Sequence, residues 1–180
     1  TPSEALEVVR TADLSLNSGL ATLQRLNEAA GFAGVRHGVV VMVDVGDLRE
    51  GIWPERAASL LQVAARLENL DLLGLGCNLA CYGGVIPSVE NMQKLIEVRE
   101  ACRKATSLEL NLLSGGNSAN LPLLASGKMP KEINHFRIGE AIVLGRNVID
   151  RSPWPGTRQD TFVLKAEVVE LEIKPSVPIG

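Results

Sequence analysis

The chain contains 180 residues, of which 46% are hydrophobic and 22% charged, and its formal net charge is −3 with a pI of about 5.5. This composition is sufficient for a substantial hydrophobic core, and the lack of any run of Lys or Arg argues against a nucleic-acid partner. No apolar run approaches the roughly 18 residues that a membrane-spanning helix needs, so no membrane association is expected.

Short apolar runs alternate with longer segments of helical periodicity along most of the chain. Strands are predicted at residues 13–17, 38–44, 72–79 and 108–113, and a fifth at 136–137 and 141–144 with an irregularity at Gly139. Helices are predicted between them: one after a Ser18 cap to about residue 31, one from Pro54 to about residue 67, one after a Ser88 cap to about residue 105, and a short one ending near Gly127.

This alternation predicts an α/β fold in which parallel strands are joined by crossover helices. An open doubly wound sheet and a (β/α)8 barrel both fit the pattern. A complete barrel needs about 250 residues, so this chain would supply only part of one.

The pattern changes after Arg151. Residues 152–156 read as a loop, and residues 161–173 read as a long strand-like run that Pro175 ends. We therefore expect a barrel portion at residues 1–150, followed at 151–180 by a linker and the first strand of a C-terminal β domain.

The segment Ser-Gly-Gly-Asn-Ser at residues 114–118 lies between a predicted strand and a predicted helix. Small residues at such a junction let backbone N–H groups approach an anion, and the positive end of a helix favours negative charge. The segment lacks the lysine of a nucleotide-binding P-loop, which favours a phosphorylated cofactor or metabolite over ATP. The same residue types also form ordinary turns and helix caps, and that alternative stays open.

Polar residues gather where the predicted strands end, which is where sites lie in parallel α/β folds. They comprise Asn17, Ser18, residues 44–49, Asn78, residues 114–118 and residues 137–140. Arg137 stands inside an apolar run, where an unpaired charge is costly, so it is expected to be paired or functional. Arg49 is suited to gripping a carboxylate, and its alternative is a surface salt bridge with Asp47 or Glu50.

Other polar residues are weaker candidates for a functional site. Asp44 could be a catalytic acid, a metal ligand or, as we favour, a structural partner of Arg49. His37 and His135 precede strands and are expected to be solvated loop histidines away from the site. Tyr82, in the loop with Cys81, could reach a ligand or pack.

The cysteines are three in number, Cys77, Cys81 and Cys102. They match no zinc-ligand spacing with the two histidines, so no metal site is expected. Free thiols in a reducing compartment are the simplest explanation, which predicts a cytoplasmic protein.

Four segments together resemble the alanine racemase superfamily of pyridoxal 5′-phosphate (PLP) enzymes, and within it the ornithine and broad amino-acid racemases. These segments are residues 43–54, 77–87, 114–118 and 137–141. Their order and spacing fit that family across essentially the whole chain.

The resemblance implies a partial (β/α)8 barrel and specific roles for residues at the PLP site. Gly116, Asn117 and Ser118 correspond to the turn that holds the PLP phosphate, and the backbone of Gly139 and Glu140 corresponds to a second phosphate-binding turn.

The resemblance also implies roles around the PLP ring and the substrate. Arg137 corresponds to the arginine that faces the pyridine nitrogen, where a permanent charge disfavours protonation of that nitrogen. Arg49 corresponds to the arginine beside the substrate carboxylate. Asn78 replaces a histidine near the ring, and Met42 replaces a carbamylated lysine that orients the arginine in many alanine racemases.

The resemblance further implies a homodimeric racemase that removes and returns the Cα proton of a small amino-acid substrate. Family members bind PLP covalently through a lysine on the first barrel strand, and that lysine has no counterpart here. We therefore expect these 180 residues alone to be inactive. A non-catalytic PLP-binding barrel protein and a barrel fragment that acts only by interaction remain as alternatives.

Overall fold

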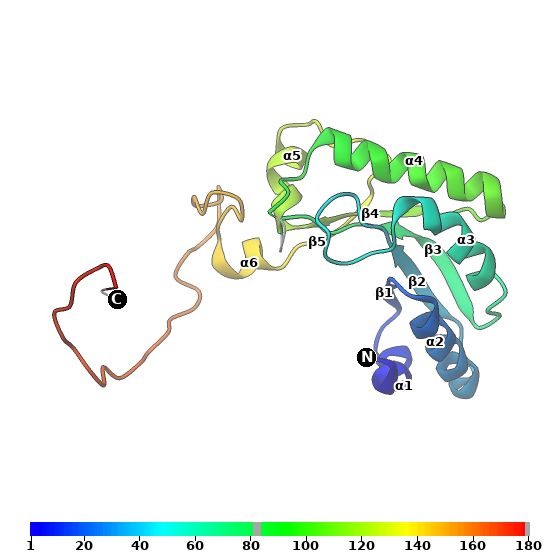
Figure 1. Ribbon diagram of the computed structural model, residues 1–180, viewed down its shortest axis with the longest axis horizontal. Coiled ribbons are helices and arrows are strands. Elements are labelled where there is room, and N and C mark those ends of the chain that lie inside the picture. The colour runs from blue at the N-terminus through cyan, green and yellow to red at the C-terminus, as the bar shows by residue number, and fades with distance from the viewer. Residues whose placement is uncertain (81–83, 179–180) are drawn as a thin grey trace.

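The computed structural model describes residues 1–80 and 84–178. Its centre is a five-stranded sheet with helices packed along one side (Figure 1). In chain order the elements are η1 (Pro2–Glu4), α1 (Ala5–Thr11), β1 (Leu14–Asn17), α2 (Leu20–Ala33), β2 (His37–Met42), α3 (Pro54–Ala64), β3 (Leu70–Gly76), α4 (Val89–Thr106), β4 (Leu112–Asn117), η2 (Ser118–Asn120), α5 (Leu121–Ala125), β5 (His135–Arg137) and α6 (Glu140–Leu144).

All neighbouring strands in the sheet are parallel, and their spatial order is β1-β2-β3-β4-β5. A doubly wound sheet would reverse its strand order at a switch point. The uninterrupted order instead makes this sheet a half-barrel. Helices α2, α3 and α4 lie along one side of it (Figure 1).

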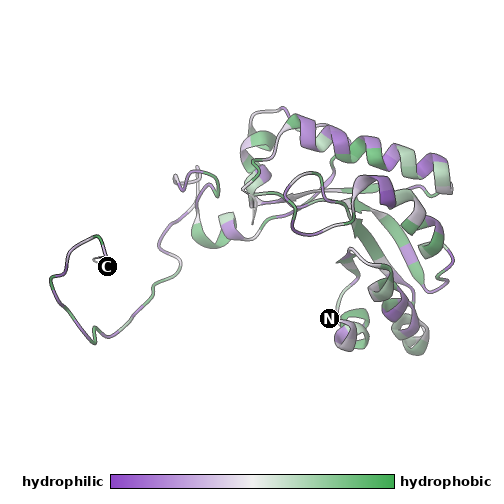
Figure 2. Cartoon of the chain, viewed as in Figure 1, coloured by the Kyte–Doolittle hydropathy of each residue, from purple (hydrophilic) through white to green (hydrophobic). Residues whose placement is uncertain are grey.

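Strand β2 is buried along its whole length, as its β-branched composition predicts. Val39, Val41 and Val43 belong to the core between the sheet and the helices, whereas Val40 and Met42 alternate to the other face. The strands consist mainly of hydrophobic residues, whereas α4 contains both hydrophobic and hydrophilic residues (Figure 2). This pattern is that of helices which bury one face against a sheet.

The start of α4 confirms the predicted Ser88 cap. The Ser88 hydroxyl accepts the backbone N–H of Asn91 at 3.2 Å, and the Asn91 side chain accepts the backbone N–H of Ser88 at 3.2 Å. This reciprocal pair satisfies donors that the first helical turn leaves free. At α2 the cap is Gly19 rather than the expected Ser18.

Several predicted strand boundaries were wrong. The third strand, expected at residues 72–79, is β3 at Leu70–Gly76, and the fourth, expected at 108–113, begins only at Leu112. β4 covers Leu112–Asn117, so most of the 114–118 segment is strand rather than turn, because β3 and β5 pair with it on both sides. Residues 141–144, expected to continue the fifth strand, lie in α6. The backbone N–H groups of Gly139 and Ala141 bond to the Ser118 hydroxyl instead of to a neighbouring strand, which turns the chain into a helix.

The strand expected at residues 161–173 is not formed. These residues are exposed and extend away from the half-barrel without a neighbouring strand (Figure 1). An extended segment needs a partner to satisfy its backbone groups as a strand, and no described segment lies beside this one.

The histidines are also placed differently from expectation. His37 is the first residue of β2, is 2% exposed, and bonds through Nε2 to the Ser15 hydroxyl at 2.8 Å. His135 opens β5 and bonds through Nδ1 to the Ser114 hydroxyl at 2.9 Å. Both are therefore structural side chains within the sheet and not solvated loop histidines.

Candidate functional site

A hollow of about 270 Å³ lies where β3, β4 and β5 end. It is lined by Asn78, Ala80, Asn117, Ser118, Arg137, Gly139, Glu140 and Val148. The parallel register places Asn117 beside Arg137, and Asn78 follows the end of the adjoining β3. The fold thus brings six of the residues singled out in the sequence to one place.

Arg137 is held at the hollow by neutral acceptors. Its Nη2 donates to the carbonyl oxygen of Cys77 at 2.9 Å and to Oδ1 of Asn78 at 3.3 Å. Its Nε is buried and has no hydrogen-bond partner within residues 1–80 and 84–178. A buried donor without a partner is costly, so this nitrogen is suited to an acceptor atom of a ligand.

Both polar atoms of the Asn117 side chain form hydrogen bonds within the protein. Its Nδ2 donates to Oδ1 of Asn78 and to the carbonyl oxygen of Leu79, both at 2.8 Å. Its Oδ1 accepts the backbone N–H of Ala119 at 2.8 Å. Asn117 therefore shapes the turn after β4, and the donors available to an anion come from its neighbours.

Ser118 joins the end of β4 to the start of α6. Its hydroxyl accepts the backbone N–H of Gly139 at 3.2 Å and that of Ala141 at 3.1 Å. The two backbone N–H groups thus hold the hydroxyl oxygen at one wall of the hollow and leave the hydroxyl hydrogen to donate. A hydroxyl held in this way can donate to an oxyanion oxygen.

Gly116 lies in β4, two residues before Ser118, and its φ is +129°. A Cβ at this position would lie 2.6 Å from Oδ1 of Asn120, so only glycine fits without displacement. Asn120 is 1% exposed and its Nδ2 donates to the carbonyl oxygen of Gly115 at 3.0 Å. No pattern in the sequence indicates this supporting role for Asn120.

The Glu140 carboxylate is engaged in an ion pair on the surface. The side chain pairs with Arg151, away from the donors around Ser118, and both side chains are largely exposed. This ion pair connects the first turn of α6 to the chain that follows it.

The loop that carries Arg49 is built differently from our expectation. Asp44 is not a partner of Arg49: its Oδ1 accepts the backbone N–H of Gly46 at 2.8 Å and that of Leu48 at 3.2 Å. Arg49 is exposed and, across the described part of the chain, makes no hydrogen bond or ion pair, so the alternative salt bridge with Asp47 or Glu50 is also not formed. Arg49 does not line the hollow.

Two titratable groups near Arg137 are held in their neutral forms. Burial raises the pKa of the Cys77 thiol to about 12, and the thiol donates to the carbonyl oxygen of Gly115 at 3.3 Å. Burial, with a smaller effect of the Arg137 charge, lowers the pKa of His135. Neither group therefore adds charge beside the guanidinium at neutral pH.

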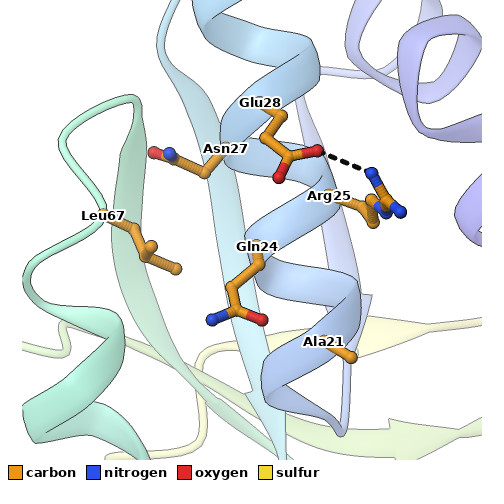
Figure 3. Close-up of a pocket in the computed structure, with 6 residues that line it drawn as sticks. All are labelled: Ala21, Gln24, Arg25, Asn27, Glu28 and Leu67. Carbon is orange, nitrogen blue, oxygen red and sulfur yellow. Dashed lines mark hydrogen bonds and ion pairs between the residues drawn. The ribbon is translucent and has the colours of Figure 1, made fainter.

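A second hollow, of about 480 Å³, lies on the outer surface of α2 (Figure 3). It is lined by Ala21, Gln24, Arg25, Asn27, Glu28 and Leu67. Figure 3 marks the exposed ion pair of Arg25 with Glu28, at 2.9 Å, among these residues. This surface lies away from the strand ends and offers no buried polar group, so the smaller hollow remains the candidate site.

The described residues contain no group of three or more His, Cys, Asp or Glu side chains that could hold a metal ion. Within the same residues, no helix is both long and apolar enough to cross a membrane. The expectations for Cys81 and Tyr82 fall outside the described residues.

A family model described as the N-terminal domain of alanine racemase matches residues 1–147. The chain belongs to this alanine racemase family. The ornithine racemase of Acetoanaerobium sticklandii is 42% identical over 178 residues, which cover 98% of this chain and 50% of that protein. The lysine racemase of Thermotoga maritima is 37% identical over 178 residues, which cover 99% of this chain and 49% of that protein.

This member of the alanine racemase family thus spans about half the length of the curated relatives that it matches. Its fold resembles that of PipY from Synechococcus elongatus PCC7942, solved with PLP bound, with a TM-score of 0.63 and 20% sequence identity. The match covers 77% of this chain and 64% of that chain. The prediction of a partial barrel of parallel strands is confirmed.

Proposed function

We propose that this chain is the PLP-binding barrel portion of an amino-acid racemase. The observation that carries the proposal is that one hollow brings together the hydroxyl of Ser118 and the buried Nε of Arg137, which has no partner among the described residues. One end of the hollow offers a single charged donor and the other offers several donors suited to a phosphate.

The residues present fit PLP. The Ser118 hydroxyl hydrogen and the backbone N–H groups of Gly139 and Glu140 would hold the phosphate, with Gly139 exchanging its bond to the Ser118 oxygen for one to the phosphate. Ala141 would keep the Ser118 oxygen in place, and Gly116 and Asn117 would shape the turn. Arg137 would donate from Nε to the ring nitrogen, and Asn78 lies between the two ends. PLP, when bound, acts as the electron sink that makes the Cα proton of an amino acid acidic enough to remove.

Each arginine would have a distinct task. The Arg137 guanidinium is permanently protonated, so beside the ring nitrogen it would disfavour protonation of that nitrogen and limit how far charge spreads into the ring. Arg49, exposed and without a partner in the described chain, would bind the substrate carboxylate through its planar fork of donors.

We propose ornithine and lysine as the first substrates to test, because relatives 42% and 37% identical to this chain carry the names ornithine racemase and lysine racemase. The hollow itself is lined by no lysine among the described residues. None of these lining residues would therefore attach PLP covalently.

The remaining parts of the proposal concern organisation. Residues 1–150 would form the barrel portion, and residues 151–180 would link it to a β domain that pairs with the extended segment 161–173. The racemase would act as a homodimer in the cytoplasm.

The test uses the full-length protein with PLP and L-ornithine or L-lysine, and follows the loss of optical rotation. We expect racemisation that Ser118→Ala and Arg137→Ala each reduce strongly, while Ser126→Ala, which removes an exposed hydroxyl bonded to Leu123, leaves it unchanged. Saturable PLP binding without racemisation would favour the non-catalytic PLP-binding alternative. Absence of any PLP binding would leave only the interaction-only alternative.

A further inference from the structure

One oxygen atom connects the two halves of the proposed PLP site. Oδ1 of Asn78 accepts Nδ2 of Asn117 at 2.8 Å and Nη2 of Arg137 at 3.3 Å. Asn78 is only 7% exposed, so this shared acceptor is shielded from water. The same neutral side chain therefore fixes the position of the guanidinium relative to the turn after β4.

The orientation of the Asn78 amide is dictated by the backbone. The N–H of Ala119 donates to Oδ1 of Asn117, which turns the Asn117 amino group toward Asn78 and Leu79. An amide NH₂ group can only donate, so Asn78 must present its oxygen to Asn117. That same oxygen then faces the Arg137 guanidinium.

The positive charge of Arg137 is not balanced by its surroundings. Its other acceptor is the neutral carbonyl of Cys77, and the Cys77 thiol is protonated at neutral pH. No carboxylate lies within ion-pair distance of Arg137 in the described part of the chain. Its Nε is buried and, within residues 1–80 and 84–178, has no partner, so its hydrogen is free to bond to a ligand.

We infer that Asn78 is a positioning residue that aims the Arg137 guanidinium at the cofactor ring while leaving its positive charge uncompensated. This inference rests on the proposed function. A carboxylate at position 78 would hold Arg137 equally well, but its negative charge would offset the positive charge of the guanidinium. The same negative charge, a few ångströms from the ring nitrogen, would favour the protonated form of that nitrogen. A methyl group would neither hold Arg137 nor alter its charge.

The test compares Asn78→Asp and Asn78→Ala in the full-length protein. The probe is pyridoxine 5′-phosphate, whose alcohol group cannot bond covalently to a lysine, so its binding reports the contacts of this hollow alone. Two quantities are measured: its dissociation constant, and the pH at which the ring nitrogen of the bound probe becomes protonated, followed by absorbance.

We expect the wild-type protein to bind the probe with its ring nitrogen unprotonated at neutral pH. Asn78→Asp should retain affinity and raise the pKa of that nitrogen by about one unit or more. Asn78→Ala should weaken binding about tenfold, the effect of losing one charge-assisted hydrogen bond, without raising that pKa.

A matched control is available at the other end of β4. Oδ1 of Asn111 accepts Nη2 of Arg103 at 3.1 Å on the surface, so Asn111→Asp adds the same charge to another Asn–Arg pair. It should change neither quantity. A wild-type protonation midpoint in Asn78→Asp, or undiminished affinity in Asn78→Ala, would overturn the inference alone. Failure of the wild-type protein to bind the probe would overturn the proposed function and the inference with it.

Discussion

The hydroxyl oxygen of Ser118 accepts the backbone N–H of Ala141 at 3.1 Å, which ties the turn after β4 to the first turn of α6. This bond is buried, and the same oxygen also accepts the N–H of Gly139. The two segments that hold the proposed phosphate site are thus joined before any ligand is present.

Ser118→Ala removes this shared acceptor. Because a buried N–H then loses its partner, the free energy of unfolding should fall by about 1–3 kcal/mol, and the affinity for PLP should fall at least about tenfold. Urea denaturation without PLP and a PLP titration measure the two effects. Ser126→Ala, at an exposed hydroxyl that donates to the Leu123 carbonyl, serves as the control and should leave both values unchanged.

Gly116→Ala should be more harmful than Gly127→Ala. Gly127, with φ of +71°, lies close to the left-handed helical region, where a Cβ costs about 1 kcal/mol, whereas Gly116, with φ of +129°, lies outside it, where the strain is about 1–3 kcal/mol. Only at Gly116 would the new Cβ also collide with Asn120, whereas nothing lies within 4 Å at Gly127. The difference in unfolding free energy should exceed about 1 kcal/mol. Equal losses would show that the turn beside Asn120 can widen.

Asp44→Ala should loosen the loop that carries Arg49, because the backbone N–H groups of Gly46 and Leu48 lose their acceptor. Trypsin cleaves after exposed arginines, so cleavage after Arg49 measures the opening of this loop. A cost of about 1–2 kcal/mol to the closed form corresponds to cleavage about tenfold faster. Asp44→Asn keeps an oxygen at this position and should cleave at close to the wild-type rate.

Arg49→Ala should separate stability from activity. The guanidinium is exposed and has no partner within the described residues, so unfolding free energy should change by less than about 0.5 kcal/mol and PLP affinity should not change. In the full-length protein, kcat/KM for the amino acid should fall about 100-fold or more, with recovery of part of it in Arg49→Lys. Arg10→Ala, an exposed arginine of α1, is the control.

Acidification should destabilise the fold through His37. Burial lowers the pKa of His37 below its usual value near 6.5, so the unfolded chain binds more protons than the folded one. The stabilisation is therefore complete above about pH 7 and is lost as the pH falls from about 6.5 through the lowered pKa of His37. His135, whose pKa is also lowered by burial, acts in the same direction.

Urea denaturation between pH 7.5 and about 5.5 tests this dependence. The unfolding midpoint should decrease toward low pH in the wild-type protein, and this slope should flatten in His37→Gln. An unchanged slope in that variant would mean that carboxylates, and not this histidine, set the pH dependence.

Much of the fold was predictable from local pattern. The β-branched run of β2, Pro54 at the start of α3 and Ser88 at the cap of α4 each specify their own element through contacts made within a few residues. The predictions failed where residues far along the chain supply the partner. Ser114 and Asn117 lie in a segment that resembles a turn in sequence, but they pair with His135 and Arg137 of β5.

The candidate site divides in the same way. Residue type and apolar period are local properties, so the sequence alone shows that small residues, amides and arginines follow the ends of parallel strands. Which of these residues meet depends on the folded chain: Arg137 bonds to the Cys77 carbonyl 60 residues away, and Asp44 bonds to its own loop rather than to Arg49. Hydrogen-bond partners depend on where the folded backbone directs each donor, and that direction is fixed only when the strands have assembled.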